Sequence, residues 1–313
     1  MNSTSIIKTL SQGLFLLMLL FSLVNCKQGN AAKNGNKKER ISFKPVFDIN
    51  YIEVARRLDN GLSFNEDGYQ LEPTWQIKFV SDDSASIYSP TKKASINFPM
   101  ARGIDSIFYA AKVFFKVKKI TRDSMLLQLI EAKEDSIDLR GAKLYMTFYA
   151  EKFIKDVVHK DLATLKAPTW RDTMFVKNLT DSAEKDYSKA FFARQPAVVS
   201  SKSSSVKVET LHVTGNILET NPTDNDYMYP TFNISIKHAK KDFYYSFSVT
   251  VDSRGGLHYE KPMVPGNNLY YISHSKAILD KYLKRYLNVK PGSTLGMVHP
   301  SSIYLHVRGK KDM

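Results

Sequence analysis

The side chains that could bind or react gather most densely in one polar loop around residue 225. Carboxylate, amide and tyrosine side chains alternate there, and the candidate ligand-binding residues are Asp224, Asp226, Tyr227 and Tyr229. Oxygen atoms at alternate positions can bind calcium, and tyrosine rings can stack on a sugar or a peptide. The loop lacks the glycine and the distal glutamate of an EF-hand loop. A plain turn, built from residues that turns favour, is therefore the competing interpretation.

The sequence contains none of the common motifs for nucleotide binding or hydrolysis. Its fourteen glycines never form G-x-G, so a dinucleotide fingerprint and a P-loop are both missing. H-E-x-x-H and G-x-S-x-G are missing as well. We therefore expect no cofactor, no metal and no assignable catalytic residue. The function that we expect is that of a non-enzymatic binding or envelope-assembly module. The alternative is an envelope hydrolase with an unrecognised active site, for which the candidates are Asp224, Asp226, His258 and His274.

One serine and one lysine have a spacing found in a known class of nucleophile. Ser273 and Lys276 form S-x-x-K, which resembles the motif of penicillin-binding enzymes. The same spacing occurs elsewhere in this Ser- and Lys-rich chain, and no K-T-G follows it. The pattern favours Ser273 as the N-cap of a helix over Ser273 as a nucleophile.

Aromatic residues are concentrated in two short segments, Phe243-Tyr244-Tyr245 and Leu269-Tyr270-Tyr271. If both lie on strands, successive side chains alternate, so at least one ring of each pair points outward. Exposed tyrosines suit a binding surface, although they are also ordinary on the edge strands of β proteins. Both interpretations stay open.

The only cysteine follows an apolar N-terminal segment, and residues 1–25 have the layout of a signal peptide. The apolar run from Leu10 to Val24 is shorter than the roughly 20 residues that a membrane-spanning helix needs. Because Cys26 is the sole cysteine, the chain can form no intramolecular disulfide and no cysteine-ligated metal cluster.

The tetrapeptide Leu23-Val24-Asn25-Cys26 resembles the lipobox of bacterial lipoproteins. The resemblance covers the first 26 residues and implies that Cys26 carries a diacylglycerol and becomes the new N-terminus. In similar lipoproteins of Bacteroidota-like bacteria, acidic residues after the cysteine accompany export to the cell surface. Lys27 and Gln28 stand there instead. We therefore expect an outer-membrane anchor with the body facing the periplasm. The alternative is a plain signal peptide cleaved near Ala31-Ala32.

Residues 26–45 form a basic, Asn- and Gly-rich tether in a chain whose formal net charge is +14. Such a tether is attracted to anionic head groups, or it serves as a soluble spacer. Export and the even spread of charge argue against nucleic acid as a partner. The expected partners are the membrane, through the lipid on Cys26, and an envelope protein or a glycan. The sequence does not predict the oligomeric state.

The composition is that of a globular protein, with 43% hydrophobic and 24% charged residues. Between Trp75 and Tyr149 the apolar residues recur with period two, and turn residues separate the runs, which predicts an antiparallel meander. This pattern looks like the lipocalin-like or open-barrel domains of bacterial lipoproteins. Residues 46–195 are thus predicted to be a β-rich domain with flanking helices. The predicted helices lie at 50–60, 151–165 and 181–193.

Residues 196–205 are rich in serine and are predicted to be a linker. Residues 206–313 are predicted to form an α+β domain that ends in a β-β-α-β arrangement. It is weakly similar to the C-terminal domain of TonB-like periplasmic proteins. The whole chain is therefore expected to be α+β and β-rich. The predicted elements of this part are strands at 206–213, 232–237, 243–251 and 257–263, a helix at 273–287 and a strand at 302–307.

Overall fold

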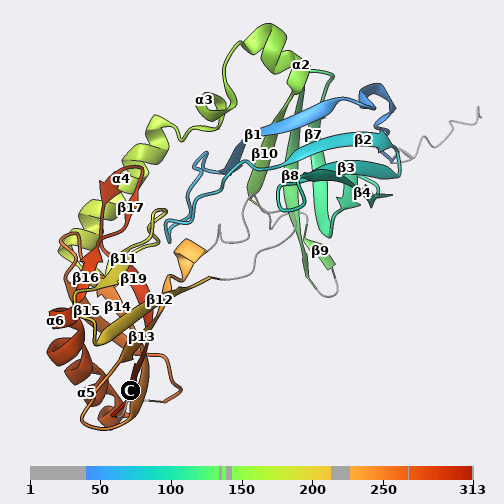
Figure 1. The fold of residues 1–313 in the computed structure, drawn as a ribbon. Coiled ribbons are helices and arrows are strands. Elements are labelled where there is room, and N and C mark those ends of the chain that lie inside the picture. Colours follow the sequence, from blue (N-terminus) through green and yellow to red (C-terminus); the bar gives the residue numbers. More distant parts are fainter. Residues whose placement is uncertain (1–39, 134–135, 139–142, 213–225, 267, 312–313) are drawn as a thin grey trace, which may run out of the picture. The chain divides into compact units, whose positions relative to one another are not determined.

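The computed structural model describes residues 40–133, 136–138, 143–212, 226–266 and 268–311. The predicted signal peptide, Cys26 and most of the predicted tether lie outside these residues. The described part is β-rich and contains a nearly closed antiparallel sheet and a separate mixed sheet (Figure 1).

The first sheet has ten strands, and every pair of neighbours in it is antiparallel. Its order is β4-β3-β2-β1-β10-β8-β7-β6-β5, with β9 paired to β8. The predicted meander is confirmed, since sequence neighbours pair with one another and β10 returns to pair with β1. The strands are β1 Asn50–Leu58, β2 Gln76–Ser81, β3 Ser84–Ser89, β4 Ala94–Pro99, β5 Ala101–Arg102, β6 Ile107–Ala110, β7 Val113–Ile120, β8 Ser124–Lys133, β9 Ser136–Asp138 and β10 Leu144–Ala150.

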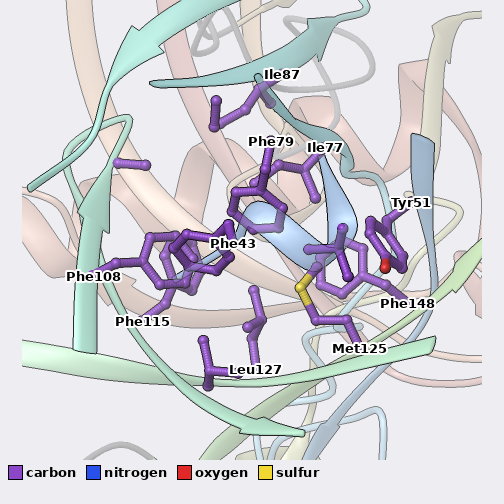
Figure 2. Packing of buried hydrophobic residues seen from close by; sticks show 14 of the residues in the cluster. Phe43, Tyr51, Ile77, Phe79, Ile87, Phe108, Phe115, Met125, Leu127 and Phe148 are labelled. Atoms are coloured by element: carbon purple, nitrogen blue, oxygen red, sulfur yellow. The ribbon is translucent and has the colours of Figure 1, made fainter. Parts of the chain in front are cut away.

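The inner face of this sheet is filled by apolar side chains, several of them aromatic (Figure 2). The 3₁₀ helix η1 (Lys44–Val46) and the residue before it, Phe43, close the interior. Phe43 is fully buried, stacks on Phe79 at 4.0 Å and meets Phe108 edge-on at 5.2 Å. Offset and edge-on ring pairs of this kind add to the free energy gained from burial. The interior is thus a packed core. A ligand would therefore bind outside this core.

The helix predicted near residues 50–60 is wrong, because this segment is strand β1, paired with both β2 and β10. The register of β1 against β10 shifts between Glu53 and Ala55, which marks a β-bulge. A bulge interrupts the two-residue alternation of a strand. Ile52 and Ala55 consequently lie on the same face of the strand at a helix-like spacing of three residues, although the backbone is extended.

The second sheet has five strands in the order β12-β13-β19-β14-β15, and β13 is parallel to β19. The four strands predicted after residue 205 and the last predicted strand are confirmed. They are β12 Val206–Leu211, β13 Thr231–Ile236, β14 Phe243–Val251, β15 Leu257–Pro262 and β19 Ser301–Gly309. Two further pairs are β11 Val198–Ser201 with β16 Leu287–Lys290, and β17 Ser293–Thr294 with β18 Met297–Val298.

A helical segment packs on the second sheet and completes its core. It consists of α5 (Leu269–Ile278), the π-helical turn η5 (Leu279–Leu283) and α6 (Lys284–Tyr286). Ile278, Leu279 and Leu283 are buried in one cluster with the inward side chains of β13, β14 and β19. The N-cap is Asn268, whose side chain accepts a hydrogen bond from the Tyr271 N–H at 3.1 Å. The predicted N-cap Ser273 is wrong, since it lies inside the helix.

The two helices predicted before residue 195 have different bounds in the structure. The first is split into α2 (Glu151–Phe153) with the π-helical turn η2 (Ile154–Val158), and α3 (Leu162–Lys166). His159, with a φ of 52°, separates the two pieces. The second is α4 (Trp170–Lys185), followed by the 3₁₀ turn η3 (Tyr187–Lys189).

The N-terminus of α4 is fixed by a capping box that also connects it to the chain before β2. Thr169 and Asp172 cap each other's backbone N–H groups. The fully buried Asp172 carboxylate also accepts the Ser63 N–H at 2.7 Å and lies 3.2 Å from Arg57 Nη1. Burial alone would raise the pKa of Asp172, but its hydrogen bonds with Ser63 and Thr169 outweigh burial and lower that pKa.

The serine-rich stretch predicted as a linker contains strand β11, which pairs with β16 just after the helical segment. Ala197 and Val199 in this stretch are buried in the core of the second sheet. The stretch is therefore part of the packed structure. The predicted boundary between a β-rich and an α+β domain stays a prediction.

Candidate functional site

A cavity of about 250 Å³ opens between the start of β14 and the helix α5, and we call it the β14–α5 pocket. Aromatic side chains from both elements form its walls, together with aliphatic side chains of the helix. Three lysines lie at its rim. The aromatic, histidine and lysine residues of its lining are Phe243, Tyr245, His274, Tyr282, Lys240, Lys241 and Lys281.

Aromatic contacts and hydrogen bonds hold α5 against β14 at this pocket. The Tyr245 ring lies 4.8 Å from that of Tyr271 and is nearly parallel to the His274 ring at 6.2 Å. The Tyr271 hydroxyl accepts the Ser246 N–H at 2.6 Å and donates to the Ser246 carbonyl at 3.1 Å. The two aromatic segments singled out in the sequence, 243–245 and 269–271, are thus brought together. The second lies on a helix, however, and not on a strand.

The imidazole of His274 has one ring nitrogen committed to the backbone. Its Nδ1 donates to the Tyr270 carbonyl at 2.9 Å, and the two rings lie 3.9 Å apart. Nε2 is therefore the nitrogen left for a ligand. Burial raises the pKa of the nearby Tyr245 phenol, so this hydroxyl is a neutral hydrogen-bond donor at pH 7.

The pocket is electropositive, because three lysines and no carboxylate are among its lining residues. The ammonium groups of Lys240, Lys241 and Lys281 have no hydrogen-bond or ion-pair partner within the part of the chain that the structure describes. The nearest carboxylates in sequence have other partners: Asp242 binds Lys310 at 3.0 Å, and Asp280 binds Lys284 at 2.8 Å. Aromatic walls under free ammonium groups suit a ligand that carries both a ring and an anionic group.

Tyr227 and Tyr229, two of the ligand-binding residues predicted from the sequence, are not among the residues that line this pocket. Asp224 lies outside the described residues, and Asp226 begins the 3₁₀ turn η4 (Asp226–Met228). Tyr227 is buried between the Tyr69 ring at 6.0 Å and the Arg194 guanidinium at 4.8 Å.

The Tyr227 hydroxyl accepts the Gln70 N–H at 3.2 Å, and burial raises the pKa of this phenol. Tyr229, in contrast, is 53% exposed and contacts the rings of Phe192 and Tyr304, each at 5.9 Å. Of the two tyrosines, only Tyr229 offers a ring face to solvent. A role of the predicted loop in ligand binding stays a prediction.

The candidate catalytic histidines lie at separate places. His258 Nε2 is 2.8 Å from Asp252 Oδ2, and the pair lines a different cavity, of about 350 Å³. Burial alone would raise the pKa of Asp252, but His258 and the N–H groups of Gly256 and Arg254 outweigh burial and lower that pKa. No serine, threonine or cysteine is among the lining residues of this cavity. The pair resembles the base and orienting acid of a hydrolase, but the described lining supplies no serine, threonine or cysteine nucleophile to it.

Neither pocket contains the ligands of a metal centre. Within the described ranges no three His, Cys, Asp or Glu side chains are grouped so as to hold a metal ion. The described helices include none with the length and apolar character required to cross a membrane.

Sequence comparison adds no relative from which a role could be transferred. No protein-family model matches the chain, and no curated protein matches it. The β14–α5 pocket is therefore judged by its own chemistry.

Proposed function

We propose that this chain is a lipid-anchored binding module of the bacterial cell envelope, and that its β14–α5 pocket binds an acidic glycan. The pocket carries the proposal: tyrosine rings form its walls, three unpaired lysines stand at its rim, and its lining contains no carboxylate. Sugar rings stack on tyrosine faces, and lysine ammonium groups bind carboxylate or phosphate substituents.

In the proposed architecture each of the two large sheets belongs to a separate domain. The proposed domain of residues 46–195 contains the antiparallel sheet and its flanking helices, and it is the part that we compare with the lipocalin-like or open-barrel domains of bacterial lipoproteins. The mixed sheet with its helix is the β-β-α-β part. Because the inner face of the first sheet is filled by side chains such as Phe43 and Phe79, the glycan is assigned to the second sheet.

The anchor in this proposal is a diacylglycerol on Cys26, which holds the body at the outer membrane on the periplasmic side. The sequence Leu23-Val24-Asn25-Cys26 supports it. Each buried methylene of an acyl chain contributes about 0.8 kcal/mol to membrane binding. The expressed protein should start at Cys26 with added acyl mass and sediment with membranes. A Cys26→Ala variant should lack the acyl mass and leave the membrane fraction. Soluble products cleaved elsewhere in both proteins would contradict the anchor.

Glycan binding is tested with a panel of uronate, sialylated and muramyl oligosaccharides, measured by isothermal titration calorimetry. Each acidic sugar is compared with its methyl ester, which keeps the ring and loses the charge. We expect the acid to bind and Lys281→Glu to weaken it by at least roughly tenfold. A charge-assisted hydrogen bond contributes about 1.5–3 kcal/mol, and about 1.4 kcal/mol corresponds to a factor of ten.

The matched control is Lys118→Glu, which changes an exposed lysine of β7 that is not among the pocket residues. It should bind as the unmodified protein does. Equal affinity for acids and esters, or equal loss in both variants, would show that binding does not use the β14–α5 pocket as proposed.

The second candidate function is an envelope hydrolase, and one observation favours it: the His258–Asp252 pair beside a cavity. Turnover of an ester or glycoside that is lost in His258→Ala but kept in Lys281→Glu would select this alternative.

A further inference from the structure

A further cavity, of about 590 Å³, is distinct from the two cavities described above, and we call it the Lys166 pocket. It is lined by the chain segment that leads into β2, by outward side chains of β2 and β3, and by the end of α3. Its volume lies within the range of roughly 300–1,000 Å³ that is usual for small-molecule sites. The residues that carry the inference are Lys166, Lys93, Thr74, Gln76, Glu72 and Tyr88.

One wall of the Lys166 pocket is held rigidly by a buried ion pair. The Glu53 carboxylate is fully buried and forms two 2.7 Å hydrogen bonds with the Arg56 guanidinium. Glu53 Oε2 also accepts the N–H groups of Thr74 and Trp75, each at 2.9 Å. Thr74 is therefore fixed in place before any ligand arrives, which reduces the entropy lost on binding.

The carboxylates around this pocket have partners, whereas its lysines have none. Glu53 is paired with Arg56, and Glu72 is paired with Arg194 at 2.6 Å. The side-chain ammonium groups of Lys93 and Lys166 have no hydrogen-bond or ion-pair partner among the residues that the structure describes. The pocket thus presents two unpaired ammonium groups to a ligand.

Lys166 is only partly exposed, so its ammonium group has lost part of its hydration. Burial lowers the pKa of the Lys166 amine, an effect opposed by the charges of Glu53 and Glu72 and reinforced by Arg56. A desolvated cation without a partner is unfavourable, and an anion placed beside it removes that cost.

We propose that the Lys166 pocket binds a small carboxylate of dipeptide or disaccharide size, with the carboxylate on Lys166. The hydroxyl of Thr74 and the amide of Gln76 supply hydrogen bonds to its polar body, and the Tyr88 ring and neighbouring prolines supply an apolar wall. This site goes beyond the proposed function, because it shares no lining residue with the β14–α5 pocket.

The probes are free dipeptides and uronic-acid disaccharides, each paired with its neutral amide, titrated into the full mature chain by calorimetry. Which of the two sets binds identifies the source of the carboxylate. At least one acid should bind more tightly than about 1 mM, the weak end of small-ligand affinity, and its amide should bind roughly tenfold more weakly. Lys166→Met should reduce the affinity for the acid to that for the amide, and Lys166→Arg should retain part of it.

Lys160→Met is the matched control, because Lys160 is exposed, close in sequence and not among the pocket residues. It should not change affinity, and neither should Lys281→Glu, which separates this site from the glycan site. A second measurement uses the unmodified chain and so does not depend on whether the variants fold. Bound acid should slow the acetylation of Lys166 but not of Lys160, as measured by peptide mass mapping. Binding by no acid, equal binding of acids and amides, unchanged affinity in Lys166→Met, or unprotected Lys166 would each overturn the proposal.

Discussion

Replacing Glu53 with alanine should lower the free energy of unfolding by about 3–5 kcal/mol, the range found when one partner of a buried ion pair is removed. The Glu53 side chain is fully buried, and only 19% of the Arg56 side chain is exposed. The substitution leaves this guanidinium without its counterion. It also leaves the N–H groups of Thr74 and Trp75 without their acceptor. Urea denaturation followed by circular dichroism measures the change.

Two further variants distinguish the loss of the ion pair from the loss of packing as the cause of the lower stability. Asp181→Asn breaks the exposed pair between Lys177 and Asp181, which should have little effect on stability. In the double variant Glu53→Ala/Arg56→Met no unpaired charge remains, so it should lose less stability than Glu53→Ala alone. A loss below about 1 kcal/mol in Glu53→Ala, the level of an exposed pair, would contradict the role assigned to this carboxylate.

Strands in which apolar and polar residues alternate regularly were predictable from the sequence. The predicted range 243–251 coincides with β14, and β7 lies within the predicted meander between Trp75 and Tyr149. In β7 the buried residues Phe115 and Val117 are two positions apart. This spacing directly reflects the geometry of an extended chain with one buried face.

The elements predicted wrongly are those in which local geometry hides the pattern. The bulge in β1 places apolar residues at helix-like spacing, and it is stabilised by long-range pairing that no local window contains. The start of helix α4 was predicted wrongly for the opposite reason, since the apolar stripe of this helix is weak. Trp170 is 75% exposed, and only Val176 and Ala183 among its apolar residues are buried. Its clearest local signal is the capping box formed by Thr169 and Asp172.

The candidate site was predictable only in part. The sequence identified the aromatic segments at 243–245 and 269–271 but did not predict that the second lies on a helix that packs against the first. The contact of Tyr245 with Tyr271 and His274 depends on how a helix packs against a sheet, and spacing along the chain carries no information on such packing. The Lys166 pocket combines residues from three separate segments of the chain, and no motif marks it.

The buried imidazole of His299 should make the stability of the protein depend on pH between about 6.5 and 4. This ring is fully buried and stacks on Phe191 at 3.6 Å. Its Nδ1 donates to the Pro300 carbonyl, and its Nε2 accepts from the Thr294 hydroxyl, both at 3.0 Å. The neutral ring therefore satisfies both partners. Burial lowers the pKa of His299 from 6.5 to about 4, and the hydrogen bond to Pro300 only partly opposes burial.

Because the pKa of His299 is lower in the folded than in the unfolded state, the unfolded chain binds the proton first as the pH falls. The stabilising contribution is complete above pH 6.5 and is lost progressively toward pH 4. The loss amounts to about 3 kcal/mol at about 1.36 kcal/mol per pKa unit. Urea denaturation at several pH values measures this slope. In His299→Gln the amide can keep a donor and an acceptor but cannot titrate, so the slope should flatten even if the variant is less stable throughout.

His159→Asn is the control for this slope, because it removes an exposed histidine and places asparagine, which tolerates a positive φ, at a φ of 52°. Its slope should equal that of the unmodified chain. If His299→Gln kept the slope of the unmodified chain, His299 would not be the source of the pH dependence. Asp172 and Asp252 have lowered pKa values, so their contributions are lost below the usual carboxyl range and not between pH 6.5 and 5. In the upper half of the pH window these two carboxylates therefore do not contribute to the slope, and the comparison with His299→Gln tests the histidine.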